Sequence, residues 1–154
     1  MPEPTHLNNE IRNMLMDCGL FVQIHPEELK VAAGYFSIVN VAKGEAIFLE
    51  GDAGTFMCIL HYGQVSIQKT DSEGKQVEVA TLRKGRAFGE MAVLDGERRS
   101  ASCYAAQDCQ LANLGKDSLE KMLNEVPKVA AKIIRVLAVS MSKRLRMADG
   151  QRVS

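Results

Sequence analysis

The segment from Gly85 to Ser102 gathers residue types that can bind an anion and a sugar hydroxyl together. Gly89 and Ala92 are small enough to let the backbone approach a ligand closely. A short helix beginning at Gly89 would direct free N–H groups toward a phosphate. Arg99 offers a planar, permanently charged guanidinium for the same phosphate, and Glu90 is an acceptor for a ribose hydroxyl.

Two short runs of this segment resemble a known family motif, and they match it without a gap: Phe88-Gly89-Glu90-Met91-Ala92 and Arg99-Ser100-Ala101. They resemble the phosphate-binding cassette of cyclic-nucleotide-binding domains, a family that includes the regulatory subunits of protein kinase A, the bacterial catabolite activator and cyclic-nucleotide-gated channels. The resemblance implies that Glu90 accepts the ribose 2′-hydroxyl and that Arg99 pairs with the exocyclic phosphate oxygens. It also implies that the amides of Gly89 and Ala92, with the Ser100 hydroxyl, complete the phosphate cradle.

The resemblance also places the purine against strand side chains, for which Ile67, Val79 and Leu82 are candidates, with an apolar core role as the alternative for each. We expect cAMP as the ligand, because the catabolite activator and some bacterial channels resemble this chain at Ser100 and prefer adenine. The alternative is cGMP, because a hydroxyl residue directly after the arginine favours guanine in some members. Ser100 is such a residue. Asp149 could accept a hydrogen bond from an adenine amino group or could lie exposed at the end of a helix.

The segment departs from the family pattern at three positions. Met91 stands where leucine is common, a mild change between apolar side chains. Arg98 stands where proline or a polar residue is common, so two arginines compete for the phosphate. We expect Arg99 to bind it, because the run Ser-Ala-Ser follows directly. Arg86 occupies a turn that often carries an acid, and we expect it to face solvent.

Short β-branched and apolar runs between glycine turns predict strands on both sides of this segment. The predicted strands cover residues 36–41, 46–49, 57–60, 65–69, 76–82, 101–106 and 109–114. Their even spacing suggests a barrel or a sandwich. The resemblance implies an eight-stranded double-stranded β-helix, or jelly roll, with turns of positive φ at Gly51, Gly54 and Gly63. The expected class is therefore mainly β, with N-terminal helices and a long C-terminal helix.

Helical spacing of apolar residues predicts helices on either side of the strands. They cover residues 9–16 and 26–33, a short helix capped by Asp117 or Ser118, and a long basic helix from Pro127 to about Met147 that Gly150 ends. The expected organisation is a disordered tail over residues 1–8, the jelly roll with its helices over 9–125, and a lid or dimerisation helix over 126–154.

Composition restricts the remaining classes. The formal net charge is zero, and 25% of the residues are charged, which favours neither nucleic acid nor an anionic membrane as a partner. The four cysteines form no Cys-x-x-Cys pair and the three histidines lie far apart, so we expect no metal site. No apolar run approaches the ~20 residues of a membrane span. The N-terminus lacks a signal-peptide core, and we expect a cytoplasmic protein.

These features favour a non-catalytic cyclic-nucleotide sensor that transmits binding through its C-terminal helix to an unknown effector protein, with a homodimer through that helix. The alternative is a regulator of the catabolite-activator type that lacks, or is separated from, its DNA-binding domain, since no helix-turn-helix pattern follows the long helix. We do not expect an enzyme, because no nucleophile–base pair stands out.

Overall fold

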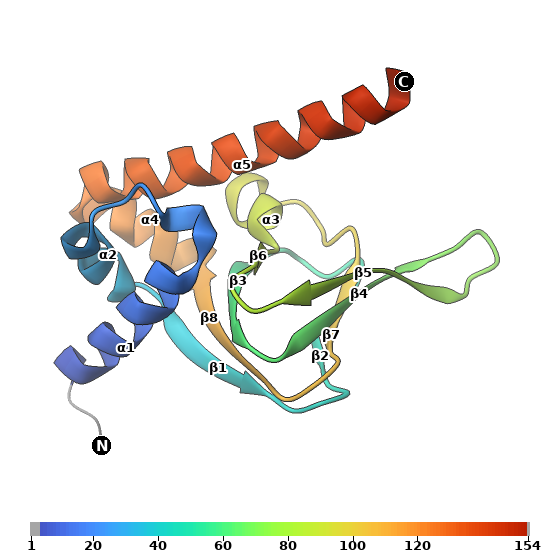
Figure 1. The fold of residues 1–154 in the computed structure, drawn as a ribbon, viewed down its shortest axis with the longest axis horizontal. Coiled ribbons are helices and arrows are strands. Elements are labelled where there is room, and N and C mark those ends of the chain that lie inside the picture. The colour runs from blue at the N-terminus through green and yellow to red at the C-terminus, as the bar shows by residue number, and fades with distance from the viewer. Residues whose placement is uncertain (1–3, 154) are drawn as a thin grey trace.

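The computed structural model describes residues 4–153, with side chains for residues 7–148. Helices gather at one end of a β-structure, and a long C-terminal helix runs along it (Figure 1). The strands are β1 (Ser37–Val41), β2 (Ala46–Phe48), β3 (Phe56–Tyr62), β4 (Gln64–Thr70), β5 (Gln76–Arg83), β6 (Ala87–Phe88), β7 (Ser102–Ala105) and β8 (Cys109–Gly115). The helices are α1 (Pro4–Asp17), the 3-10 turn η1 (Gly19–Phe21), α2 (Pro26–Ala33), α3 (Glu90–Asp95), α4 (Lys116–Glu125) and α5 (Pro127–Val153).

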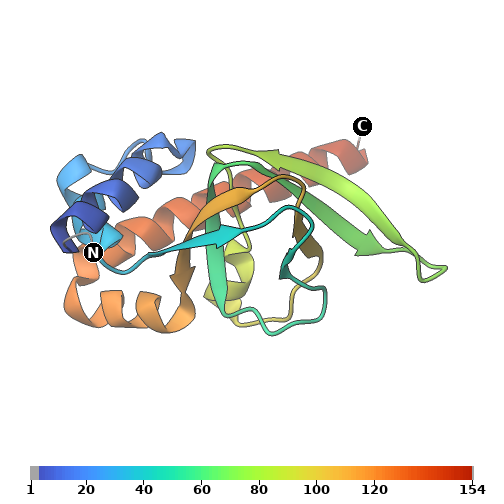
Figure 2. The ribbon, with the colours of Figure 1, turned by 90° about the horizontal axis from the view of Figure 1, so that it is seen from below.

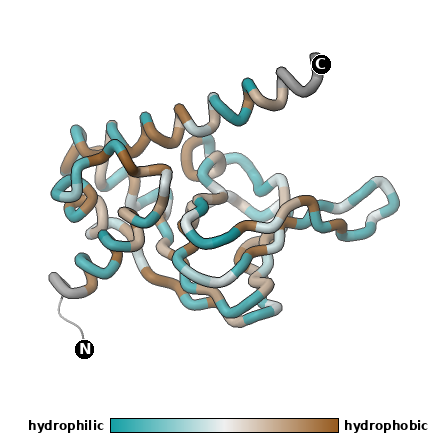
Figure 3. Tube along the Cα trace, viewed as in Figure 1, coloured by the Kyte–Doolittle hydropathy of each residue, from teal (hydrophilic) through white to brown (hydrophobic). Residues whose placement is uncertain are grey.

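The strands form two antiparallel sheets in the orders β1-β8-β3-β6 and β2-β7-β4-β5. Strands that are distant in sequence therefore pair, such as β1 with β8 and β2 with β7. This wrapping confirms the predicted eight-stranded jelly roll with N-terminal helices and a long C-terminal helix. The β4–β5 hairpin projects from the body in both views (Figures 1 and 2), and its tip is hydrophilic (Figure 3).

Strand β3 separates two apolar cores, because its successive side chains point to opposite faces. Met57 and Ile59 pack with the helices α1, α2, α4 and α5. Cys58 and Leu60 point between the two sheets. The helical core packs the N-terminal half of α5 against the barrel and also includes Val93 of α3. The second core includes Phe88, directly before the turn into α3.

Three helix boundaries differ from the sequence expectation. Helix α1 begins at Pro4, so residues 4–8 are helical rather than part of a loose tail; proline is well tolerated in a first helical turn. Helix α4 has Gly115 as its N-cap with no side-chain cap, so neither predicted polar cap is used. Helix α5 continues through Gly150 to Val153, because a single glycine costs a helix only about 1 kcal/mol.

Gly54 has a different role from the one expected. Gly51 and Gly63 have positive φ, as predicted, but Gly54 does not. A Cβ atom on Gly54 would lie 2.0 Å from the Cβ of Ala92. Its lack of a side chain therefore lets the turn after β2 pack directly against α3, which fixes the position of that short helix.

Candidate functional site

A cavity of about 500 Å³ lies beside α3, between the barrel and α5. Every residue of the two predicted runs lines it: Phe88, Gly89, Glu90, Met91, Ala92, Arg99, Ser100 and Ala101. Side chains from other elements complete the lining, among them Phe48, Ile67, Lys69, Leu82, Cys103 and Arg144. The structure thus brings one continuous segment and several distant elements to the same hollow.

Gly89 forms the turn that begins the site. It has φ +75° and serves as the N-cap of α3, a left-handed conformation that side chains with a Cβ rarely adopt. A Cβ atom at this position would lie 2.7 Å from Nη1 of Arg99. Glycine is therefore required here twice, for the backbone turn and for the passage of the arginine side chain beside it.

Arg99 carries a buried charge at the inner end of the cavity. The residue is only 5% exposed. Its Nη1 donates to the carbonyl of Gly89 at 3.1 Å, its Nη2 donates to the carbonyl of Phe56, and its Cζ lies 3.8 Å from the ring centroid of Phe48. Burial lowers the pKa of the guanidinium, although thiols and Asp52 oppose that shift.

The arginine lacks a charged partner. Neither of the two ion pairs found among residues 7–148 includes Arg99, and its buried Nε has no hydrogen-bond partner there. Burying a charge without a counter-ion is costly. An anion bound in this cavity would offset that cost, so the geometry fits an anionic ligand.

The two adjacent arginines point in different directions. Arg98 is exposed at the rim, and its Nη1 donates to the carbonyl of Gly51 at 2.8 Å. The backbone of Arg99 forms two hydrogen bonds with the turn after β2. Its N–H donates to the carbonyl of Asp52 at 2.8 Å, and its carbonyl accepts from the N–H of Gly51 at 2.9 Å. Successive side chains of such an extended segment alternate between faces, which sends Arg99 inward and Arg98 outward.

Glu90 is the second buried charge of the site, at 4% exposure. It forms an ion pair with Arg144, which reaches the cavity from α5. Burial, and secondarily the positive charge of Arg86, lower the pKa of Arg144. The carboxylate is therefore held at the point where the barrel segment meets the C-terminal helix.

Arg144 was not among the predicted site residues, although the sequence contains a signal for it. It follows the buried Ile133 and Leu137 at helical spacing and so lies on the stripe of α5 that faces the barrel. The neighbouring Lys143 and Arg146 lie off that stripe. Arg86 is exposed, as expected, and it also lines the cavity rim near Arg144.

The strand side of the cavity is partly as expected. Ile67 and Leu82 line it and are half-buried. Val79 does not line it and is 54% exposed. Val79 lies three residues before Leu82, so alternation along the strand directs the two side chains to opposite faces. Val79 is also left unpaired at a β-bulge, because Ile67 pairs with Ala80 while the next residue pairs with Glu78. Asp149 lies outside the residues whose side chains are described.

Two further properties limit the chemistry of the cavity. Burial raises the pKa of the Cys103 thiol to about 12, so the sulfur facing the cavity is protonated near neutral pH. Within residues 7–148, no group of three or more His, Cys, Asp or Glu side chains is arranged to hold a metal ion.

Of the helices in residues 4–153, none has the length and apolar character needed to cross a membrane.

The fold and the site together define a jelly-roll ligand-binding module closed by a C-terminal helix. A sequence model of the cyclic nucleotide-binding domain matches residues 38–126, which is more than half of the chain. The chain therefore belongs to the cyclic-nucleotide-binding domain family.

Similar proteins agree with this assignment. The chain is 35% identical to the cyclic AMP receptor protein of Thermus thermophilus over 130 residues, which cover 84% of this chain and 58% of that protein. It is 30% identical to a cGMP-dependent protein kinase of Toxoplasma gondii, covering 94% of this chain and 14% of the kinase. The chain thus spans little more than half, or much less, of these curated relatives.

Solved structures show the same fold. A cyclic nucleotide-binding domain from Methylobacillus flagellatus matches with a TM-score of 0.81 and 26% identity, covering 96% of this chain and 83% of that one. The catabolite activator protein of Thermus thermophilus matches with a TM-score of 0.77 and 32% identity, covering 86% of this chain and 60% of that one.

Proposed function

We propose that this protein is a non-catalytic sensor that binds a cyclic nucleotide, cAMP in the first place and cGMP as the alternative, in the cavity beside α3. The observation that carries the proposal is Arg99, a residue that is only 5% exposed at the cavity wall and has no ion-pair partner among residues 7–148. The single negative charge of a cyclic phosphate diester would neutralise it.

Each part of the ligand has a matching group in the cavity. Arg99 would hold the exocyclic phosphate oxygens, with the backbone N–H groups of the Gly89–Ala92 turn and the hydroxyl of Ser100 beside it. Glu90 would accept the ribose 2′-hydroxyl, since a carboxylate paired with one guanidinium keeps free acceptor positions. Ile67 and Leu82 would contact the purine face.

The Glu90–Arg144 ion pair supports transmission through α5. Of the two ion pairs found in residues 7–148, Glu90–Arg144 joins the cassette segment to the C-terminal half of α5. A ribose bound to Glu90 would lie against this ion pair. Binding therefore changes the environment of Arg144 directly. A helix held by such a contact can shift its population between positions when the ligand binds.

Two observations support a binding role rather than catalysis. Glu90 is engaged by Arg144 and is not a free general base. The Cys103 thiol has a pKa raised to about 12, which leaves almost no thiolate to attack phosphorus near neutral pH.

Titration calorimetry with cAMP, cGMP and the open-chain 5′-AMP tests the proposal. We expect tight binding of cAMP, weaker binding of cGMP and weak binding of 5′-AMP, whose dianionic phosphate exceeds the charge that Arg99 alone balances. Both purines are measured because the relatives include a cyclic AMP receptor protein and a cGMP-dependent protein kinase. Absence of binding by either cyclic nucleotide at high micromolar concentration would refute the sensor.

We also propose a homodimer through α5. Ile134, Ala138, Met141 and Leu145 recur at alternating spacings of four and three, the pattern of a two-helix seam. Leu145 is 63% exposed and would be buried by a partner helix. Sedimentation velocity of Leu145→Glu should show a monomer, whereas Met147→Glu, which is equally exposed but off the seam, should sediment as the wild type. Equal behaviour of both variants would reject the seam.

A regulator of the catabolite-activator type, separated from its DNA-binding part, is the second candidate. The similarity to the Thermus cyclic AMP receptor protein favours it. A mobility shift with duplex DNA at physiological salt, with and without cAMP, distinguishes it from a sensor that acts on an effector protein. Under either proposal we place the protein in the cytoplasm, because all four cysteines are free, buried thiols, as is usual in a reducing compartment.

A further inference from the structure

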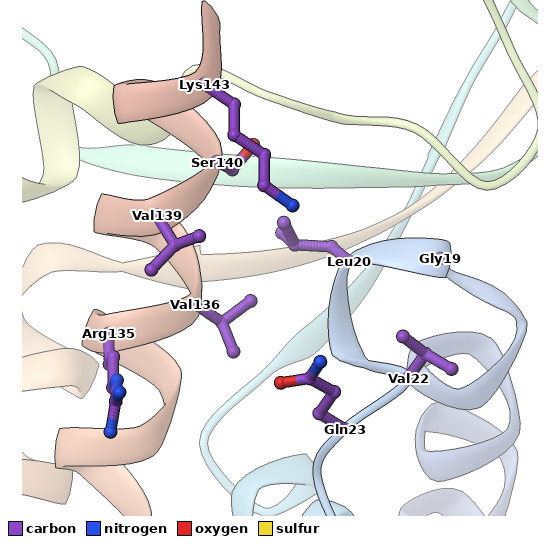
Figure 4. Close-up of a pocket in the computed structure, with 9 residues that line it drawn as sticks. All are labelled: Gly19, Leu20, Val22, Gln23, Arg135, Val136, Val139, Ser140 and Lys143. Atoms are coloured by element: carbon purple, nitrogen blue, oxygen red, sulfur yellow. The ribbon is translucent and has the colours of Figure 1, made fainter.

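A second hollow, of about 260 Å³, lies between the 3-10 turn η1 and the middle of α5. Residues 19–23 provide one wall, and the α5 face that carries Val136, Val139 and Lys143 provides the other. Figure 4 shows the side chains of Lys143 and Leu20 extending toward one another between the two walls. We call this hollow the η1–α5 groove. It shares no lining residue with the cavity beside α3 that we propose binds the nucleotide, hereafter the nucleotide cavity.

Two apolar side chains of the groove, Val22 and Val139, are exposed and belong to neither apolar core. Val22 is 79% exposed and Val139 is 45% exposed. The packing of α5 on the barrel uses a different stripe, which includes Ile133 and Leu137, both fully buried. The proposed dimer seam through Leu145 lies on yet another side of the helix. Leu20 and Val136 also pack against the helical core. Neither the cores, the nucleotide cavity nor the seam accounts for the exposed Val22 and Val139.

The charged groups of the groove all have one sign. Arg135 and Lys143 are its only ionisable lining residues, and no carboxylate lines it. Lys132, one turn away on α5, already pairs with Glu28. Neither of the two ion pairs found in residues 7–148 involves Arg135 or Lys143. Gln23 and Ser140 add an amide and a hydroxyl to the walls.

We propose that the η1–α5 groove docks a short segment of a partner protein in which an apolar side chain is flanked by Asp or Glu. The aliphatic walls would bury the apolar side chain, and Arg135 and Lys143 at the edges would pair with the carboxylates. A groove favours an inserted side chain over the flat surface of a membrane. This surface would supply the effector contact that the sensor needs, and the docking itself does not depend on the nucleotide.

Peptide selection tests the docking directly. A random dodecapeptide phage library is selected on the full chain, with counter-selection on Val139→Asp. We expect enriched sequences in which Leu, Ile, Val or Phe lies next to Asp or Glu. By fluorescence anisotropy, the corresponding synthetic peptides should bind Val139→Asp and Lys143→Glu at least about tenfold more weakly than the wild type, a difference of about 1.4 kcal/mol.

Val77→Asp is the matched control, because Val77 on β5 is 42% exposed, close to the 45% of Val139, and does not line the groove. It should bind the peptides as the wild type does. Circular dichroism verifies the fold of each variant. Should Val139→Asp fail to fold, Lys143→Glu and Arg135→Glu, both on exposed side chains, decide the test alone.

Four outcomes overturn the proposal: no enrichment, peptides that bind all variants equally, binding to phosphatidylserine vesicles that Val139→Asp abolishes while no peptide binds, or a dimer that Val139→Asp dissociates while no peptide binds. Calorimetry with cAMP on the same preparations separates this proposal from the sensor function. Peptide docking without nucleotide binding would refute only the sensor, and nucleotide binding without docking would refute only the groove.

Discussion

The two ends of the nucleotide cavity are built in opposite ways. We call the end proposed to hold the phosphate the phosphate end. It comes from one continuous segment, residues 88–101, and holds two charged residues that are almost completely buried, Glu90 and Arg99. The base end comes from β4, β5 and α5, and its side chains, such as Leu82 and Lys69, are half-buried or exposed. If the proposed function holds, the phosphate meets groups that are already buried in place, whereas the purine meets side chains that are still partly exposed.

The contacts of Arg99 hold its side chain in one position at the phosphate end. Two carbonyl groups accept hydrogen bonds from the guanidinium, and the Phe48 ring lies against it. The arginine therefore has little rotamer freedom to lose on binding, which favours affinity. The base end has no comparable set of contacts. Of the two ion pairs in residues 7–148, only Glu90–Arg144 connects α5 to the segment that carries α3.

Helix α5 shows the same contrast along its length. Ala130, Ile133 and Leu137 in its first half are fully buried. In its second half, Leu145 and Met147 are 63% and 66% exposed. An element that is anchored at one end and held by one ion pair near the other is suited to move when that ion pair changes.

Replacement of Arg99 should have the largest effect on affinity. Arg99→Ala removes the counter-charge of the phosphate, and we expect a loss of a few hundredfold in cAMP affinity, roughly 3–4 kcal/mol. We expect cAMP to raise the melting temperature of the wild type and to raise that of Arg99→Ala much less. Titration calorimetry gives the affinity. Arg98→Ala is the matched control and should change affinity less than about threefold, because its guanidinium binds the carbonyl of Gly51 at the rim.

The contrast would break if the two arginine variants lost similar affinity. In that case the phosphate would lie at the rim with Arg98, and the buried Arg99 would be a structural residue that serves the carbonyls of Gly89 and Phe56.

Replacement of Arg144 should have an intermediate effect. Arg144→Ala leaves the buried Glu90 without its ion pair and disorders the acceptor of the ribose hydroxyl. We expect a loss of about tenfold in cAMP affinity, together with faster amide hydrogen exchange over residues 139–148. Arg146→Ala, on an exposed neighbour that does not line the cavity, should change neither quantity. Unchanged exchange in Arg144→Ala would show that other contacts hold the second half of α5.

The same contrast explains how much of the site was predictable. Continuous spacing specifies the phosphate end, so all eight cassette residues could be named from the sequence, and the structure places them together. The choice of Arg99 over Arg98 followed from the small residues after it, and burial distinguishes the two arginines in the same way.

The base end was less accessible to sequence reasoning, because it depends on long-range pairing. The family resemblance suggested both Val79 and Leu82, although their separation of three residues directs the two side chains to opposite faces of β5. The bulge at Val79 requires the folded pairing and cannot be recognised in the sequence. Arg144 lies close to two other basic residues, Lys143 and Arg146, and only its helical phase relative to Ile133 distinguishes it from them. The turn at Gly54 was recognised, but its close contact with Ala92 requires the folded arrangement.

Replacement of a base-end side chain should have the smallest effect. Leu82→Ala removes apolar surface that would contact the purine, and we expect a loss of about fivefold in affinity, roughly 1 kcal/mol. The loss should be equal for cAMP and cGMP, because a contact with the ring face does not distinguish their exocyclic groups. Val79→Ala is the matched control on the same strand and should leave the affinity unchanged, since Val79 lies outside the cavity. If Val79→Ala weakened binding as much as Leu82→Ala, the purine would lie across the opposite face of β5, and the base end would need a different set of contacts.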